Sequence, residues 1–148
     1  NGIPKEILIS GDGNSLKFDA NTFALVCEFG VLHHVEKPQK FVSEMLRVSQ
    51  KYIFISDSNN FGQGNPLIRL LKQTINFIGL WRVFDFVMTR GKKYHSSEDD
   101  GIFYSYSVFN NYKQIEKECS NIYITNTKGN GINSYRDASN VALFAIKK

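Results

Sequence analysis

The chain has 148 residues, of which 42% are hydrophobic and 22% are charged, and its formal net charge is +4. This composition predicts one packed domain and excludes an intrinsically disordered chain. No apolar run approaches the ~20 residues that a membrane span needs, so a membrane is not an expected partner. The lysines are scattered, and only residues 90–94 combine basic and aromatic side chains, so nucleic acid is not an expected partner either.

The two cysteines do not indicate a disulfide framework. We expect Cys27 in a buried strand and Cys119 at the end of a helix, both as small buried hydrophobic side chains. A reducing, cytoplasmic setting fits this use of cysteine. The first residue is Asn1 and no signal-like segment follows, so we expect the chain to begin inside a longer protein.

The first half of the chain alternates short apolar runs with one amphipathic stretch. Residues Ile7–Ile9 and Phe23–Cys27 have the length and composition of buried strands, and a polar loop separates them. Residues Pro38–Val48 are predicted to form a helix, with proline at its first position and apolar residues on one face. Residues Lys51–Ser56 are predicted to form the third strand.

The second half carries further helix signals around an aromatic-rich segment. Asn65 and Pro66 favour the start of a helix that Gly79 can end. The segment 80–106 reads as an insert or lid, helical in part of 81–88. The remaining elements are expected as a helix capped by Ser107 and reaching Cys119, a half-exposed strand around Ile122 and Ile124, and a buried strand at Val141–Ile146.

This order of elements predicts an α/β fold with a mostly parallel sheet and helices on both faces. The last two strands are joined by residues 129–140 without an intervening helix. The final strand is therefore expected to run antiparallel to the others.

Five short motifs in a fixed order resemble one enzyme family: Gly11-Asp12-Gly13, Phe18-Asp19, Val31-Leu32-His33-His34-Val35, Glu44-Met45-Leu46-Arg47-Val48 and Ile53-Phe54-Ile55-Ser56-Asp57. Together they resemble the C-terminal half of a class I S-adenosylmethionine-dependent methyltransferase, of the methyltransferase type 11 kind. The resemblance implies a partial Rossmann-like methyltransferase sheet, with residues 1–148 as a single partial domain.

Two elements of that family have no match in this sequence. They are the glycine-rich turn after the first strand and the carboxylate that holds the ribose. We therefore expect the chain alone to bind S-adenosylmethionine, the cofactor of the complete protein, poorly. In the family's strand order the strand at Ile7–Ile9 would lack neighbours, so a homo-oligomer or a strand-swapped dimer is expected.

The resemblance also implies a cofactor site. Asp12 matches the family carboxylate that accepts a hydrogen bond from the adenine amino group, and Gly13 would let the loop approach the ring. Glu28, Phe29 and Gly30 match the turn beside the methionine part of the cofactor. From the residues alone, Asp12 can equally be a turn aspartate, and residues 28–30 can be a strand-ending turn without a ligand.

The candidates for a catalytic base are His33, Asp57 and His95, in that order. A structural histidine held by hydrogen bonds is the alternative for His33 and for His34. No metal site is expected, because adjacent side chains point in different directions and no cysteine or carboxylate set completes a cluster.

By analogy with the fold, Asn59 and Asn60 face a small-molecule substrate, and Tyr104 and Tyr106 belong to the lid. Asn59 can instead satisfy loop backbone groups, and the aromatic residues can instead be core. The leading hypothesis is methyl transfer to a small-molecule O, N or C nucleophile, with the fragment itself inactive. The alternative is a non-catalytic methyltransferase-like binding or scaffold module. The spacing from His33-His34 to Arg47-Val48 argues against an unrelated doubly wound protein.

Overall fold

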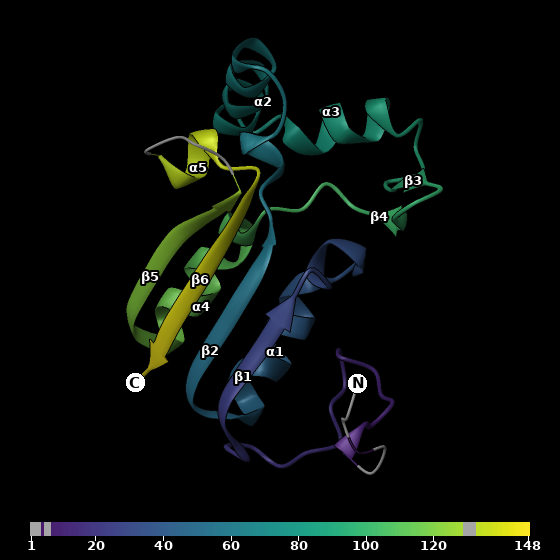
Figure 1. Cartoon of the computed structure of the whole chain (residues 1–148). Coiled ribbons are helices and arrows are strands. Elements are labelled where there is room, and N and C mark those ends of the chain that lie inside the picture. Colours follow the sequence, from purple (N-terminus) through teal and green to yellow (C-terminus); the bar gives the residue numbers. More distant parts are fainter. Residues whose placement is uncertain (1–3, 5–6, 129–132) are drawn as a thin grey trace.

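The computed structural model describes residues 4, 7–128 and 133–148. Its centre is a four-stranded sheet in the order β1-β2-β6-β5 (Figure 1). The four strands are β1 (Phe23–Phe29), β2 (Ser49–Ser58), β5 (Cys119–Lys128) and β6 (Asn140–Lys147). Strands β1 and β2 are parallel, and β6 is antiparallel to both β2 and β5. Three strands therefore share one direction and the last opposes them, which confirms the predicted α/β fold and its antiparallel last strand.

Two helices, α1 (Pro38–Val48) and α4 (Tyr112–Glu118), lie together behind the sheet in Figure 1. Helix α1 has the predicted bounds, and its buried residues Val42, Met45 and Leu46 follow the helical period. They pack in one core with Ile53 and Ile55, the inward-facing residues of β2. The chief hydrophobic layer therefore lies between these helices and the sheet.

The opposite face of the sheet carries aromatic side chains. Tyr52 and Phe144 stack across β2 and β6, with ring centroids 5.5 Å apart, and Phe29 lies against Phe54. Phe29 is 67% exposed. Cys27 is also exposed, contrary to the prediction, because it lies on the same face of β1 as Phe29. Cys119, at the end of α4, is buried as expected.

The helices and the hairpin formed by residues 60–103 lie beyond one end of the sheet (Figure 1). Helix α2 (Pro66–Phe77) begins as predicted, with the Asn65 side chain accepting a hydrogen bond from the backbone N–H of Ile68. Gly79, with φ +78°, follows its end. The predicted insert contains α3 (Trp81–Met88) and a hairpin of β3 (His95–Ser97) and β4 (Gly101–Phe103).

Short helices complete the fold. They are η2 (Leu32–His34), η3 (Asn60–Gly62), η4 (Val108–Asn111) and α5 (Ser134–Asp137). Ser107 caps η4 by accepting a hydrogen bond from Phe109 N–H, so the helix predicted from Ser107 begins as a 3-10 turn.

None of the helices in the described part of the chain has the length and apolar character that a bilayer span requires.

The prediction of a buried strand at Ile7–Ile9 is wrong. Ile7 lies in a single 3-10 position, Leu8 and Ile9 have no regular structure, and all three side chains are exposed. None of the strands in the described part of the chain pairs with this apolar run, and a strand is stable only when its backbone groups find partners. The prediction that no helix lies between the last two strands is wrong, because α5 lies in the connection 129–140. Residues 129–132 of this connection lie outside the described part of the chain.

Candidate functional site

The carboxyl ends of β1 and β2 meet at one edge of the sheet, where the chain turns at Gly30. Gly30 has φ +66°, a conformation that favours glycine, and its N–H donates to the carbonyl of Ser56 at 2.9 Å. A Cβ atom at this position would meet only His33 Cε1, at 3.8 Å. The turns near residues 30 and 57 are thus joined, and the backbone at Gly30 is open to close approach.

Asp57 holds the segment that follows this turn. Its side chain is 1% exposed, and Oδ2 accepts hydrogen bonds from the N–H groups of Leu32 at 2.8 Å and His33 at 3.3 Å. The other oxygen, Oδ1, lies 2.6 Å from Nδ1 of His33. Asp57 is therefore a positioning residue, because its oxygens are occupied by donors and are shielded from a substrate.

Glu28 lies beneath the same segment and is 4% exposed. Its Oε1 accepts hydrogen bonds from the N–H groups of Val31 and Leu32. Its Oε2 is buried without a hydrogen-bond partner in the described part of the chain. Burial, with a contribution from the charge of Asp57, raises the pKa of Glu28 to about 8. Glu28 therefore holds a proton at neutral pH and supports the turn from inside.

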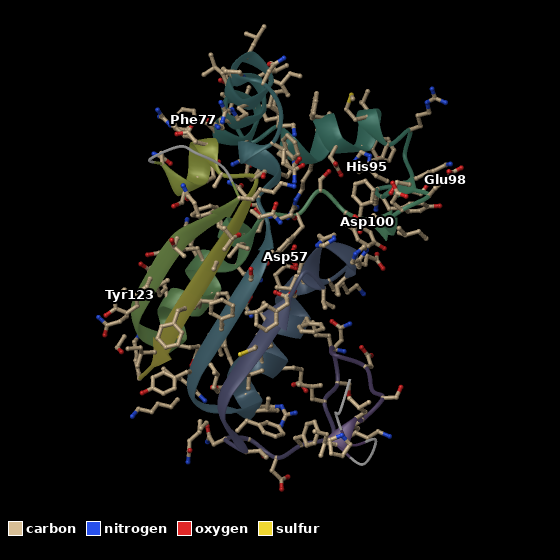
Figure 2. The ribbon with its side chains drawn as sticks, viewed as in Figure 1. Asp57, Phe77, His95, Glu98, Asp100 and Tyr123 are labelled. Atoms are coloured by element: carbon tan, nitrogen blue, oxygen red, sulfur yellow. The ribbon has the colours of Figure 1, made fainter. Side chains whose placement is uncertain are left out.

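A cavity of about 440 Å³ opens beside His33. Its lining includes Asn60 from η3 and three residues of the insert, His95, Asp100 and Tyr104. Figure 2 shows Asp57, His95 and Asp100 at the end of the sheet, on the side where the hairpin lies. The structure thus brings the predicted bases His33 and His95 to one cavity. Two larger hollows lie on other helices, away from this cluster.

The hairpin is attached to the histidine segment by two hydrogen bonds. Tyr104 N–H donates to the carbonyl of His33 at 2.7 Å, and Nδ1 of His34 lies 2.7 Å from the carbonyl oxygen of Ile102. His95 stacks on Phe103, and its Nε2 is 3.3 Å from the hydroxyl of Ser105. His34 therefore has the structural hydrogen bond expected for it, while His95 already has a partner.

The four predicted substrate residues divide into two pairs. Asn60 and Tyr104 line the cavity, and Nδ2 of Asn60 is a buried donor without a partner in the described residues. Asn59, in contrast, is fully buried, and its Nδ2 donates to three carbonyl groups of residues 134–138. Tyr106 also borders the cavity, but its buried hydroxyl donates to Asn111. Asn59 therefore satisfies loop backbone groups, which is the alternative to substrate contact that the sequence allowed, and the Tyr106 hydroxyl is engaged elsewhere.

The loop that carries Asp12 packs against α1. Oδ1 of Asp12 accepts a hydrogen bond from the N–H of Asn14 at 2.8 Å, which is the plain turn that the residues alone allowed. A Cβ atom at Gly13 would lie 2.0 Å from the Phe41 ring, so glycine is needed here for packing. The hydrogen bonds of the described loop residues join it to Glu44 and Arg47, not to the turns at Gly30 and Asp57.

The sequence places Asp100 in the insert but does not predict its contact with the two adjacent histidines. Its carboxylate lies in the hairpin, with Oδ1 3.5 Å from Nε2 of His34 and Oδ2 3.7 Å from Nε2 of His33. The argument against a metal site does not hold, because the two adjacent imidazole rings lie 4.0 Å apart between centroids and a carboxylate joins them. Asp100 is 66 residues or more along the chain from this pair, so no local spacing could have indicated the contact.

One family model matches part of the chain, and solved structures share its fold. Residues 2–52 match the family model described as a methyltransferase domain. An S-adenosylmethionine-dependent methyltransferase from Thermotoga maritima, described as a possible histamine N-methyltransferase, superposes with a TM-score of 0.60 at 14% identity, covering 95% of this chain. An S-adenosylmethionine-dependent methyltransferase from Methanosarcina mazei gives a TM-score of 0.54 at 13% identity and covers 93%.

The chain spans 63% of the length of the first of these structures and 65% of the second. At these identities the likeness concerns the fold. No curated protein is significantly similar to the chain in sequence.

Proposed function

Because the chain carries a methyltransferase-domain segment over residues 2–52, we propose that the protein transfers a methyl group from S-adenosylmethionine to a small-molecule O, N or C nucleophile. The observation that carries the proposal is the joining of the turns at Gly30 and Asp57 at the carboxyl edge of the sheet, beside a cavity. Open α/β sheets bind ligands at this edge.

The residues at this edge fit the methionine end of the cofactor. Gly30 leaves its backbone open, and the exposed ring of Phe29 stands next to it on the uncovered face of the sheet. We assign these two residues to the methionine part. We assign Asp12 to the adenine amino group, because its side chain is exposed. Its Oδ1 accepts a hydrogen bond from Asn14, a residue of the same turn.

His33 is the group that we assign to proton uptake when the acceptor begins protonated. Nδ1 of His33 carries the hydrogen that faces the Asp57 carboxylate. In the neutral ring Nε2 therefore has a free lone pair, and His33 lines the cavity. A bound cofactor would supply an electrophilic methyl group, whose bond to sulfur would break as the acceptor takes the carbon. The acceptor's proton would pass to Nε2 of His33, and the buried carboxylate of Asp57 would stabilise the resulting imidazolium.

The cavity also limits the shape of the acceptor. Five aromatic or imidazole rings border it, from His33, His95, Phe103, Tyr104 and Tyr106. Flat rings bind a planar or partly apolar molecule best. We therefore propose a small planar acceptor.

Calorimetry with S-adenosylmethionine tests the proposal on two samples, this chain and the full product of its coding sequence. Binding by the full product is expected, and Asp12→Ala should weaken it by roughly tenfold, the equivalent of one good hydrogen bond. Asp19→Ala is the matched control, because Asp19 is an exposed carboxylate on the same loop. Equal affinity in the two variants would remove the assignment of Asp12.

A non-catalytic scaffold module is the second candidate. It is favoured by the open edge of β1, whose neighbour on that side is absent from the described sheet. Absence of cofactor binding in both samples would favour the scaffold and contradict methyl transfer. Cofactor binding by the full product, followed by methyl transfer that His33→Gln slows while cofactor affinity is kept, would favour the enzyme.

A further inference from the structure

Three side chains that the proposed reaction does not use as a set meet at the mouth of the cavity. His33 and His34 are consecutive in η2, and Asp100 comes from the turn between β3 and β4. One ligand atom from each of them lies within 4.8 Å of the others. Figure 2 shows Asp100 projecting from the hairpin towards the segment that follows β1.

The hydrogen bonds behind the two rings settle where their protons lie. Nδ1 of His34 is 2.7 Å from the Ile102 carbonyl oxygen, and a carbonyl only accepts, so this nitrogen carries a hydrogen. Nδ1 of His33 likewise faces the carboxylate of Asp57 at 2.6 Å. In their neutral forms both rings therefore present a bare Nε2 lone pair. A carbonyl or carboxylate behind a histidine is the usual support of a metal ligand.

Both lone pairs face the same carboxylate. The Nε2 atoms of His33 and His34 lie 3.7 Å and 3.5 Å from the two oxygens of Asp100. Lone pairs and a carboxylate repel one another unless a proton or a metal ion lies among them. These separations are long for hydrogen bonds, but two ligands on one tetrahedral zinc ion, each at about 2.1 Å, lie roughly 3.4 Å apart.

We propose that His33, His34 and Asp100 form a binding site for a divalent transition-metal ion of the Zn²⁺ type. Two imidazoles and one carboxylate suit such an ion, whereas Mg²⁺ and Ca²⁺ prefer oxygen ligands only. His34 and Asp100 are exposed, so the ion can reach the site from solvent. Three protein ligands leave the fourth position of a tetrahedral ion open towards the cavity.

Metal binding at this site does not depend on the proposed methyl transfer, but a bound metal ion would affect that reaction. The same Nε2 of His33 cannot hold a metal ion and take up a proton. An occupied site would therefore withdraw the base that we assign to His33, and added Zn²⁺ would slow transfer to a protonated acceptor.

The test is calorimetric titration of ZnCl₂ into this chain after chelator treatment, at neutral pH. One strong site per chain is expected. His34→Asn keeps a donor for the Ile102 carbonyl and removes Nε2, and Asp100→Asn removes the carboxylate. Each should weaken binding by roughly 10- to 100-fold. Asp99→Asn, the adjacent exposed carboxylate outside the cluster, is the control and should not change the affinity.

Nitrogen chemical shifts provide a second readout that does not require any variant to fold. Zn²⁺ should move the Nε2 resonances of His33 and His34 and leave those of His95 in place. Absence of strong binding, equal affinity in Asp100→Asn and Asp99→Asn, or a shift at His95 alone would each overturn the proposal.

Discussion

Nδ1 of His33 lies 2.6 Å from Oδ1 of Asp57, although the two residues are 24 positions apart. The contact links the turn after β1 to the end of β2, and the other Asp57 oxygen receives two backbone N–H groups of the same turn. One buried side chain therefore determines both the path of the turn and the orientation of the imidazole ring.

Replacement of Asp57 should lower stability strongly. Asp57→Ala removes the 2.8 Å hydrogen bond of the Leu32 N–H and leaves that group only its longer bond to Glu28. It also removes the partner of His33 Nδ1. We expect the free energy of unfolding to fall by roughly 2–4 kcal/mol, measured by urea denaturation. Asp99→Asn, an exposed carboxylate, should leave it unchanged. A loss no larger than that of the control would contradict the role of Asp57.

Glu28 should make stability depend on pH. Its folded pKa is raised from 4.5 to about 8, chiefly by burial. Between these values the unfolded chain loses the proton that the folded chain keeps, so stability is highest below pH 4.5 and declines as pH rises to about 8.

Glu28→Gln should flatten this decline. The measurement is the free energy of unfolding at several pH values across that window, for the wild type and the variant. Glu36→Gln, an exposed glutamate close by, should follow the wild type. Parallel curves for the wild type and Glu28→Gln would show that Glu28 titrates normally.

Gly13 should not tolerate a side chain. In Gly13→Ala the new Cβ would lie 2.0 Å from the Phe41 ring, so we expect a loss of about 1–3 kcal/mol from overpacking. In Gly11→Ala no atom of the described residues lies within 4 Å of the new Cβ, so this variant is the matched control. Adding Phe41→Leu should recover part of the loss. If Gly13→Ala and Gly11→Ala are equally stable, the packing argument is wrong.

We propose that the chain associates with a second copy through β1. This strand is at the edge of the sheet, and Phe23, Leu25 and Phe29 expose apolar side chains along it. Unpaired edges pair readily with other strands. Sedimentation should show a dimer whose share grows with concentration and falls in Leu25→Lys. Tyr123→Lys, on the other edge strand β5, is the control, and a monomer at every concentration would refute the proposal.

The elements that the sequence predicted best are those with local signals. Helix α1 has a proline at its start and a regular apolar face, and its predicted bounds agree with the structure. Ile7–Ile9 has an equally apolar run, but a strand also needs a neighbour, and none of the described strands pairs with it. Sequence periodicity reports side-chain preference and carries no information on whether a partner strand exists.

In the candidate site, too, the sequence predicts features that have local signals and does not predict contacts that depend on distant residues. His33 was identified from its motif, because a polar residue after a strand lies at the ligand-binding edge. The burial of Asn59 depends on carbonyl groups at 134–138, and the approach of Asp100 depends on the fold of a hairpin. Such contacts arise from tertiary packing, so neither could be read from the residues nearby.

The attachment of the β3–β4 hairpin to η2 has a mechanical consequence. Two bonds, from Tyr104 to His33 and from His34 to Ile102, hold the hairpin, and Asp100 is carried on its tip. An outward swing would break both bonds and separate the carboxylate from the rings in one movement. Release of the hairpin and dismantling of the three-residue cluster are thus a single event, and the exchange rate of the Tyr104 amide proton would time it.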